Sequence, residues 1–262
     1  MIRVAAVGDI HLGPDSAGAL RPAFDTLGEC ADVLLLAGDL TRHGTAEEAQ
    51  VVAGEVAGLD VPVVAVLGNH DYQSDQQAAV TAALEAVGVR VLEGEGTVLD
   101  INGVRVGVAG TKGFGGGFAG RSGGEFGEPE MKAFIQYSRR CADGLRTALD
   151  VLERKDCAVR IALTHYAPVP DTLVGEPLEI YPFLGSYLLA EAVDGAAADL
   201  AVHGHAHMGV EHGMTSGGVR VRNVAQPVIG QAFAVYHLGV RDSADDAGDG
   251  APTPRPHATT AG

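Results

Sequence analysis

Five stretches of the chain are apolar at almost every position and run directly into a polar motif. They are residues 1–7, 33–37, 61–67, 160–163 and 200–202. An apolar run of this length is typical of a strand that is buried on both faces of a sheet. Each run is followed within two residues by Asp, Asn or His. Because ligand crevices form at the carboxyl ends of such strands, we expect these polar side chains to converge on one site.

Helical periodicity separates the first strands. Residues 45–48 have the Thr-x-x-Glu spacing of a capping box and predict a helix over 45–58. Residues 74–77 have a Ser-x-x-Gln spacing and predict a second helix that stops at Gly88. Two further helices are expected, over residues 19–30 and 130–155. The alternation of strand and helix predicts parallel strands with crossover connections.

Shorter apolar runs follow in the middle of the chain and near its end. Those at residues 96–101 and 104–108 are separated by Asn102-Gly103, which is a strong signal for a two-residue β-hairpin. Further short strands are expected at residues 89–92, 219–224 and 232–238. The pattern therefore predicts an α/β fold in which antiparallel strands extend a parallel core.

The polar strand ends are spread over most of residues 1–240, so we expect these residues to form one domain. Residues 241–262 consist mainly of Asp, Ala, Gly, Pro and Thr, a composition that does not support a packed core. We expect a disordered, acidic tail there.

A glycine-dense segment occupies residues 110–129 and carries the cations Lys112 and Arg121 among phenylalanines. It lacks the Gly-x-x-x-x-Gly-Lys-Ser/Thr order of a phosphate-binding loop, which argues against a nucleoside triphosphate site. Loops of this length are either functional or disordered. Two interpretations stay open: a flexible connection, or a mobile lid that brings cationic and aromatic side chains to a substrate.

The formal net charge of −16 argues against broad binding to nucleic acids and to anionic membranes, which favour basic surfaces. An anionic substrate would need local positive charge, which bound metal ions can supply. Three cysteines without a CxxC spacing argue against a disulfide framework and a cysteine zinc site. The sequence has no signal-peptide pattern and no apolar run of membrane length, so we expect a cytoplasmic protein. The sequence does not indicate an oligomeric state.

The polar motifs at the strand ends have the residue types of a metal centre. Asp-x-His at Asp9 and His-x-His at His205 each place two side chains on one side of an extended segment. Mixed oxygen and imidazole ligands suit divalent ions such as Mn, Fe, Zn or Co. Charge favours two ions, since two Asp carboxylates would leave about +2 to attract hydroxide and phosphate. The candidate ligands are Asp9, His11, Asp39, Asn69, His165, His205 and His207.

Each candidate taken alone has a more ordinary explanation. An isolated Asp39 would be a turn or helix cap, and an isolated His165 would be a hydrogen-bonded core histidine. The ordered occurrence of ligand residues at five strand ends is what favours a metal site. His203 is one step from the last motif and is a candidate for contact with the ligands. The histidines outside the pattern are His43, His212, His237 and His257.

In this order the motifs resemble those of the calcineurin-like metallophosphoesterase superfamily, namely Asp-x-His, Gly-Asp, Gly-Asn-His-Asp/Glu, His and Gly-His-x-His. This sequence carries them at residues 9–11, 38–39, 68–71, 165 and 204–207. The resemblance implies a four-layer α/β/β/α sandwich of mixed sheets with a two-metal site at the strand ends.

Carried over by motif, the resemblance also implies a role for each residue. Asp9, His11 and His207 would bind the first metal, Asn69, His165 and His205 the second, and Asp39 both. His70 would lie beside the substrate phosphate and protonate or hydrogen-bond the leaving oxygen, with Asp71 orienting it. The hypothesis for the reaction is an in-line attack on phosphorus by a hydroxide that bridges the two metals.

One departure separates the chain from the phosphoprotein phosphatases of this superfamily. Their Gly-Asp-x-x-Asp-Arg-Gly motif is changed here, so that Arg42 and His43 stand at the Asp and Arg positions. The chain looks more like the bacterial phosphodiesterases, including those that hydrolyse cyclic nucleotides. We therefore expect a phosphodiesterase that acts on a small phosphorylated compound such as a nucleotide. The candidate contacts to substrate or ligands are Arg42, His43, Lys112, Arg121, Tyr166 and His203.

Three alternatives stay open. A phosphomonoesterase or nucleotidase would use the same centre, and a non-catalytic scaffold would use only the fold. DNA processing is disfavoured by the acidic composition. Neither the natural substrate nor the metal follows from the ligand residues, because affinity order and metal supply decide the metal as much as geometry does.

Overall fold

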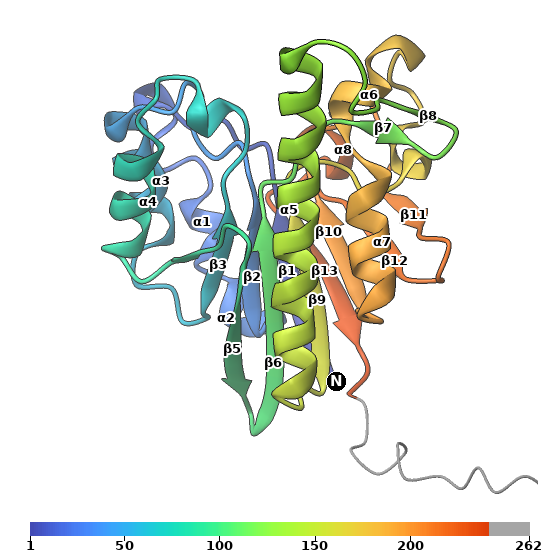
Figure 1. Cartoon of the computed structure of the whole chain (residues 1–262). Coiled ribbons are helices and arrows are strands. Elements are labelled where there is room, and N and C mark those ends of the chain that lie inside the picture. Colours follow the sequence, from blue (N-terminus) through green and yellow to red (C-terminus); the bar gives the residue numbers. More distant parts are fainter. Residues whose placement is uncertain (241–262) are drawn as a thin grey trace, which may run out of the picture.

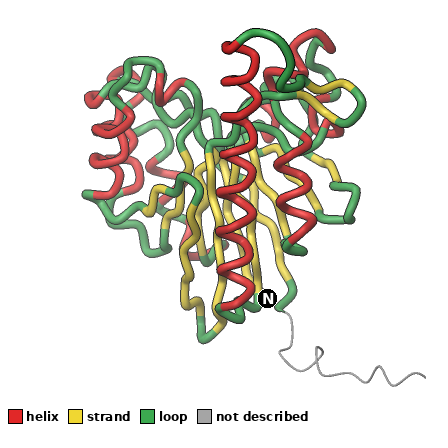
Figure 2. Tube along the Cα trace, in the orientation of Figure 1, coloured by secondary structure: helices red, strands yellow, loops and turns green. Residues whose placement is uncertain are grey.

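The computed structural model describes residues 1–240 of the chain. Two large mixed β-sheets lie against each other and carry helices on their outer sides (Figure 1, Figure 2). This is the four-layer α/β/β/α arrangement that the resemblance implies. The tail predicted for residues 241–262 lies outside the described residues.

The first sheet has the strand order β13-β1-β2-β3-β4. Its parallel strands are β1 (Ile2–Val7), β2 (Val33–Ala37), β3 (Val63–Val66) and β4 (Arg90–Val91). β13 (Ala234–Leu238) pairs antiparallel with β1 at one edge. The strands predicted at residues 1–7, 33–37, 61–67, 89–92 and 232–238 are thus all present in this sheet.

The second sheet has the strand order β11-β12-β10-β9-β6-β5. Its parallel strands are β6 (Val104–Thr111), β9 (Val159–Thr164), β10 (Leu200–His203) and β12 (Arg220–Asn223). The antiparallel strands β5 (Glu95–Ile101) and β11 (His212–Met214) form its edges. The predicted hairpin is confirmed, because Asn102 and Gly103 join β5 to β6 with φ of 53° and 78°, as a two-residue turn of this kind requires.

The helices complete the outer layers. The first sheet is covered by α1 (Arg21–Phe24), α2 (Leu27–Cys30), α3 (Ala46–Val56) and α4 (Gln77–Glu85). The second is covered by α5 (Pro129–Arg154) and α7 (Tyr187–Gly195). Along β2, Leu34 and Leu36 pack in the core beneath the first helices, whereas Leu35 packs in the core between the sheets. This two-sided burial explains why the strand is apolar throughout.

Short elements lie in the connections. They are η1 (Pro14–Ser16), η2 (His70–Tyr72), β7 (Gly117–Phe118), β8 (Arg121–Ser122), η3 (Pro170–Leu173), η4 (Leu178–Ile180), α6 (Tyr181–Leu184) and α8 (Gln226–Ile229). Among residues 1–240, no helix combines the length and the hydropathy that a membrane span needs.

The helix starts agree only in part with the sequence patterns. The capping box at Thr45 is confirmed, because its hydroxyl accepts the N–H of Glu48 and the Glu48 carboxylate accepts the N–H of Thr45. The second capping box is wrong. α4 begins after Gln76 without a side-chain cap, and the hydroxyl of Ser74 donates to the carbonyl of His43 instead.

The helix predicted over residues 19–30 is divided into α1 and α2. At the break, the Thr26 hydroxyl donates to the carbonyl of Ala23, three residues back. Such a local bond competes with the regular helical bonding of the main chain. α7 and β11 were not predicted from the sequence pattern at all.

The glycine-dense segment is not a uniform flexible connection. Its first residues complete β6, and the N–H groups of Gly116 and Gly117 donate to the carbonyls of Pro182 and Gly185. A Cβ at Gly115 would lie 2.6 Å from the Pro182 carbonyl oxygen, so this close approach of two chains requires glycine. Residues 119–133 are exposed, and the lid interpretation stays a prediction for them.

Candidate metal centre

The predicted ligand side chains gather where strands of both sheets end. Asp9 and His11 follow β1, Asp39 follows β2, Asn69 and His70 follow β3, His165 follows β9, and His205 and His207 follow β10. In Figure 1 these carboxyl ends lie at the top of the two sheets, at the same end as α6 and the β7–β8 hairpin.

The candidate ligand atoms form two clusters that share Asp39. One cluster contains Asp9, His11, Asp39 and His207, and the other contains Asp39, His165 and His205. Within each cluster the ligand atoms lie within 4.8 Å of one another. Asn69 adjoins the second cluster, because its Oδ1 lies 3.0 Å from Nε2 of His165.

The main chain is unusual at four of these residues. Asp9, His11, Asp39 and His205 have φ of 55°, 41°, 49° and 70°. They are half of the eight non-glycine residues with positive φ in residues 1–240. Such conformations are costly for residues with a Cβ and are concentrated at functional sites. At the strand ends, the backbone therefore adopts conformations that position the side chains, although these conformations are less stable than ordinary turns.

Hydrogen bonds between the strand-end loops fix these conformations. The N–H of Asp9 donates to the Gly38 carbonyl at 2.9 Å, and the N–H of His11 donates to the Asp39 carbonyl at 3.1 Å. The carboxylates take part as well. Oδ1 of Asp39 accepts the N–H of His70 at 2.8 Å, and Oδ2 of Asp9 accepts the N–H of His205 at 2.9 Å. The protein's own backbone thus orients both carboxylates.

Two motif glycines make room for these carboxylates. A Cβ at Gly68 would collide with Oδ1 of Asp39, and a Cβ at Gly204 would collide with Oδ2 of Asp9. Both motifs therefore need glycine because of the side chain that lies opposite.

Backbone carbonyls set the orientation of two imidazoles. Nδ1 of His165 lies 2.9 Å from the Ala37 carbonyl oxygen, and Nδ1 of His70 lies 2.8 Å from that of Arg42. A carbonyl only accepts, so in both rings Nδ1 carries the hydrogen. In the neutral form of His165, Nε2 then keeps its lone pair, an arrangement that is usual for histidines that bind metals.

The expected contact between Asp71 and His70 is wrong. The fully buried Asp71 carboxylate accepts the N–H groups of Leu40, Thr41 and Gly68 and the hydroxyl of Thr41. Asp71 therefore joins the loop after β2 to the loop after β3. The Arg42 carbonyl, which the motif gives no reason to single out, holds His70 instead.

Burial and the pairing of Asp39 with His165 shift the pKa values within the second cluster in different directions. Burial lowers the pKa of His205 to about 3, and the neighbouring His165 adds to this shift, so the ring is neutral at pH 7. Burial raises the pKa of Asp39, but the charge of His165 and its hydrogen bond lower this pKa by a larger amount. Asp39 therefore stays ionised. The two effects have opposite signs for His165. Burial lowers the pKa of its ring, but Asp39 raises it by a larger amount, to about 9.

One buried nitrogen tests whether the clusters fit a metal. Nε2 of His11 has no hydrogen-bond partner among residues 1–240, and the nearest carboxylate oxygen, Oδ2 of Asp39, is 3.9 Å away. A buried polar atom without a partner is costly. Carboxylates, imidazoles and an amide oxygen around such an atom form a donor set that suits divalent ions of the Mn, Fe, Co and Zn group.

Comparison with known proteins agrees with this geometry. The sequence model of the calcineurin-like phosphoesterases matches residues 2–209. The chain belongs to this family. It is accordingly a metal-dependent phosphoesterase, and both clusters lie within the matched residues. No curated protein matches the chain.

Solved structures share the fold of this phosphoesterase. Phosphopantetheinyl hydrolase from Mycobacterium tuberculosis has a TM-score of 0.61 and 16% identity over 85% of this chain and 88% of that one. The protein TT1561 of Thermus thermophilus has a TM-score of 0.56 and 21% identity over 85% of this chain and 88% of that one. A 5′-nucleotidase precursor from Thermus thermophilus has a TM-score of 0.50 and 16% identity over 85% of this chain and 48% of that one. At these identities the likeness shows the fold alone.

Tyr166 and Lys112 lie along one side of the candidate metal centre. The Tyr166 ring lies 4.3 Å from that of His205, centre to centre. The Lys112 carbonyl accepts the N–H groups of His165 and Tyr166 at 3.0 and 3.1 Å. The Lys112 ammonium is buried, which lowers its pKa. It lies 5.0–5.3 Å from the ring centres of Tyr72, Phe114, Tyr137 and Tyr166.

The other candidate contacts lie differently. Arg42 pairs with Asp15 at 2.8 Å, and Nδ1 of His43 lies 2.8 Å from Oε1 of Glu48 at the start of α3. Arg121 is exposed on β8. His203 is buried, and its Nε2 lies 2.8 Å from the hydroxyl of Thr172. His203 therefore contacts the segment after β9 and not the clusters.

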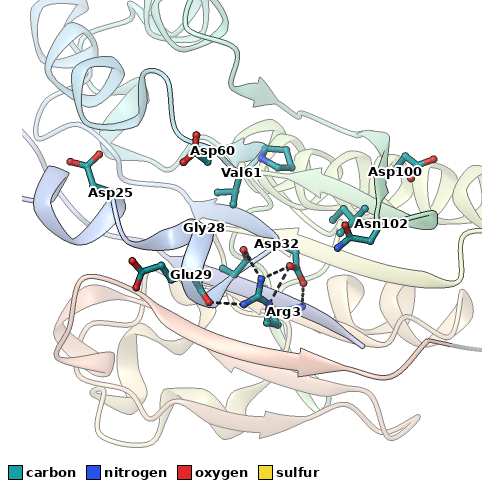
Figure 3. Close-up of a pocket in the computed structure, with 12 residues that line it drawn as sticks. Arg3, Asp25, Gly28, Glu29, Asp32, Asp60, Val61, Asp100 and Asn102 are labelled. Carbon is teal, nitrogen blue, oxygen red and sulfur yellow. Dashed lines mark hydrogen bonds and ion pairs between the residues drawn. The ribbon is translucent and has the colours of Figure 1, made fainter.

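A hollow of about 600 Å³ lies at the opposite end of the first sheet, beside Arg3 near the start of β1 (Figure 3). Its acidic lining residues are Asp25, Glu29, Asp32, Asp60 and Asp100, and Arg3 is held by Asp32 at 2.7 Å. This acidic lining does not suit an anionic phosphoester, in contrast to the ligand clusters at the strand ends on the other side.

Proposed function

We propose that this protein is a phosphodiesterase that hydrolyses a small phosphodiester at a dinuclear metal centre. The observation that supports this most strongly is the pair of ligand clusters that share Asp39. In the proposed centre one ion is held by Asp9, His11 and His207, the other by Asn69, His165 and His205, and Asp39 contacts both.

Two bound ions, for which we propose Mn, Fe, Zn or Co, would neutralise phosphate oxygens and lower the pKa of water toward neutrality. The chain's own contribution is to orient the ligands before metal binds. Ala37 fixes the tautomer of His165, and the backbone N–H groups of His70 and His205 hold the carboxylates of Asp39 and Asp9. Fixed ligands lose less conformational entropy on binding and resist distortion during the reaction.

His70 is the proposed general acid for the leaving oxygen. Because Nδ1 is committed to the Arg42 carbonyl, a proton on Nε2 is the one available to a substrate. The ring lies 4.5 Å from that of His11, centre to centre, which places it at the edge of the first cluster. General acid catalysis of this kind typically contributes about 10²- to 10⁴-fold.

The basic side chains near the centre support a diester over a monoester. A phosphomonoester dianion carries one more negative charge than a diester and gains more from a guanidinium contact. Arg42 is instead paired with Asp15, and the Lys112 ammonium is enclosed by aromatic rings. The fold likeness to a 5′-nucleotidase precursor supports phosphomonoester hydrolysis as the second candidate.

Hydrolysis of two chromogenic esters by the full chain tests the proposal. The protein is stripped of metal, reloaded with manganese, and assayed with bis(p-nitrophenyl) phosphate and with p-nitrophenyl phosphate. We expect metal-dependent turnover with a higher kcat/KM for the diester. A preference for the monoester would favour the second candidate, and metal binding without turnover of either ester would favour the scaffold interpretation.

The cytoplasm stays the proposed location. It is supported by Cys30, Cys141 and Cys157, which are all free thiols in a chain whose structure provides no disulfide between them.

A further inference from the structure

Exposed large hydrophobic side chains are concentrated in one part of the chain. Residues 1–240 expose ten of them, and nine lie between residues 126 and 214. Six of these nine, exposed between 37% and 67%, form what we call the apolar rim: Val174, Leu178, Ile180, Phe183, Met208 and Val210. Single exposed apolar residues are ordinary, whereas a group in two neighbouring segments marks a binding surface.

The two segments of the rim are tied together by hydrogen bonds. The N–H of Met208 donates to Oε1 of Glu176 at 2.8 Å, and the N–H of Val210 donates to the Thr172 carbonyl at 3.0 Å. Beneath them lies a small core of Phe118, Ala167, Leu173, Leu184 and Ala206. The rim is therefore carried by a packed base, and its apolar side chains are presented to solvent by ordered backbone.

The apolar rim is continuous with the metal centre. Met208 directly follows the candidate ligand His207, and the Phe183 carbonyl lies 3.3 Å from Nε2 of His205. α6, which carries Phe183, lies at the same end of the molecule as the strand ends of the centre (Figure 1). The rim thus lies within reach of a group attached to a phosphate at the centre.

A run of aromatic rings also leads from the centre to the rim. Tyr166 lies 4.3 Å from His205 and 5.6 Å from Phe114, measured between ring centres. Phe114 lies 4.9 Å from Phe134, which lies 6.3 Å from Phe183. The wall between the centre and the rim is therefore apolar, so a substrate that crosses it needs few polar groups there.

Charge narrows the choice of occupant. Between residues 161 and 219 the chain has no Lys and no Arg, while the rim segments carry Asp171, Glu176 and Glu179. Such a surface is repelled by an anionic bilayer, which attracts basic segments. An uncharged apolar chain on a single molecule in solution is not repelled by these carboxylates. Four of the six rim side chains are aliphatic, and the flexible side chain of the exposed Met208 adapts to flexible ligands.

We propose that the apolar rim binds an aliphatic chain attached to the phosphate of the substrate. The preferred small phosphodiesters are then esters of an alkyl or acyl-bearing alcohol, taken up as single molecules from solution. This inference rests on the proposed phosphodiesterase function, whose substrate class it specifies. Each methylene that becomes fully buried contributes roughly a fourfold gain in affinity or kcat/KM.

A homologous ester series tests the rim. The manganese-loaded full chain is assayed with methyl, butyl and octyl p-nitrophenyl phosphate, at concentrations below and above the point at which each ester aggregates. Because the leaving group is constant, differences report binding of the alkyl chain. We expect kcat/KM to rise by at least about 30-fold from methyl to octyl, as partial burial of several methylenes requires. Equal values would overturn the proposal, and so would a rise that appears only above the aggregation concentration, which would indicate a membrane-like surface.

Two rim variants and one matched control locate the effect. Leu178→Ser and Met208→Ser remove apolar area from the rim, so the rise from methyl to octyl should shrink several-fold in each. Met214→Ser changes a methionine with 54% exposure that lines a separate hollow with Phe118 and Val169. Met214→Ser should keep the steep rise. An equal loss in all three variants would contradict binding at the rim.

A binding measurement separates this inference from the proposed function. Calorimetry compares octylphosphonate with methylphosphonate on the manganese-loaded protein, without any turnover. We expect tighter binding of octylphosphonate, a negative heat-capacity change, and loss of the difference in Leu178→Ser. That result without ester hydrolysis would contradict the phosphodiesterase and keep the rim. Equal binding of both phosphonates beside active ester hydrolysis would contradict the rim and keep the phosphodiesterase.

Discussion

Nδ1 of His70 lies 2.8 Å from the backbone carbonyl oxygen of Arg42. This contact ties the imidazole that follows β3 to the loop that follows β2, and it fixes which nitrogen carries the hydrogen. Since the fixing group is a carbonyl, a change of the Arg42 side chain leaves it in place. The proposed general acid is therefore oriented by main chain, which is more rigid than a carboxylate partner.

Replacing His70 should affect chemistry and not metal binding. We expect His70→Ala to lower kcat by about 10²- to 10⁴-fold for a diester with an alkyl leaving group, because such a group needs a proton. The loss should be much smaller with p-nitrophenolate, which leaves without one. Metal content, measured by mass spectrometry of the purified protein, should be unchanged. Equal losses on both leaving groups would argue against an acid role.

Asp39 is expected to control both metal clusters. Asp39→Asn removes the charge shared by the two clusters and should lower bound metal and diester turnover together. Asp60→Asn is a matched control, because Asp60 lines the hollow at the opposite end of the first sheet. Metal analysis and kinetics on both variants check this. Full metal content and activity in Asp39→Asn would contradict the proposed ligand set.

A pair of glycine substitutions separates site geometry from helix stability. Gly68→Ala places a Cβ against Oδ1 of Asp39, so it should destabilise the fold and weaken metal binding. In α3, a Cβ at Gly54 meets nothing within 4 Å, so Gly54→Ala should stabilise the fold by roughly 0.5–1 kcal/mol. Urea unfolding gives both values. Equal stabilities for the two variants would show that the loop after β3 accommodates a side chain.

The ion pair at the opposite end predicts a pH dependence of stability. The hydrogen bond from Arg3 lowers the pKa of Asp32, with a smaller opposing effect of burial. A carboxyl group with a lowered pKa in the folded state stabilises the fold above its unfolded pKa of about 4, and this stabilisation is lost as the pH falls below that value. The free energy of unfolding should therefore fall less steeply below about pH 4 in Asp32→Asn than in the parent protein. Urea titrations between pH 3 and 7 measure both slopes, and equal slopes would exclude this pair as a source.

The clustering of the candidate ligands could be predicted because they are motif residues at the ends of apolar strands. Two contacts that orient the histidine rings could not be predicted from the sequence. Ala37 and Arg42 act through their carbonyls, which every residue has. The expected contact between Asp71 and His70 is wrong for a related reason. His70 is adjacent in sequence, whereas the hydrogen-bond donors to Asp71 at Leu40 and Thr41 lie in another loop.

The parts of the fold that sequence patterns missed depend on long-range contacts. The segment from Gly110 to Phe118 reads as flexible because glycine carries no local preference, but its order comes from packing against Pro182 and Gly185. The apolar rim was equally hidden. Its side chains resemble core residues in sequence, and only the three-dimensional structure shows that they are exposed beside the metal centre.

The central claim, that two metals act together in diester hydrolysis, is tested most directly by a metal titration. Manganese is added to the stripped full chain while bound metal per chain and turnover of bis(p-nitrophenyl) phosphate are measured on the same samples. We expect little turnover at one bound ion per chain and full turnover only as the second ion binds. Full turnover with one bound ion, or turnover that does not respond to metal, would contradict a dinuclear phosphodiesterase.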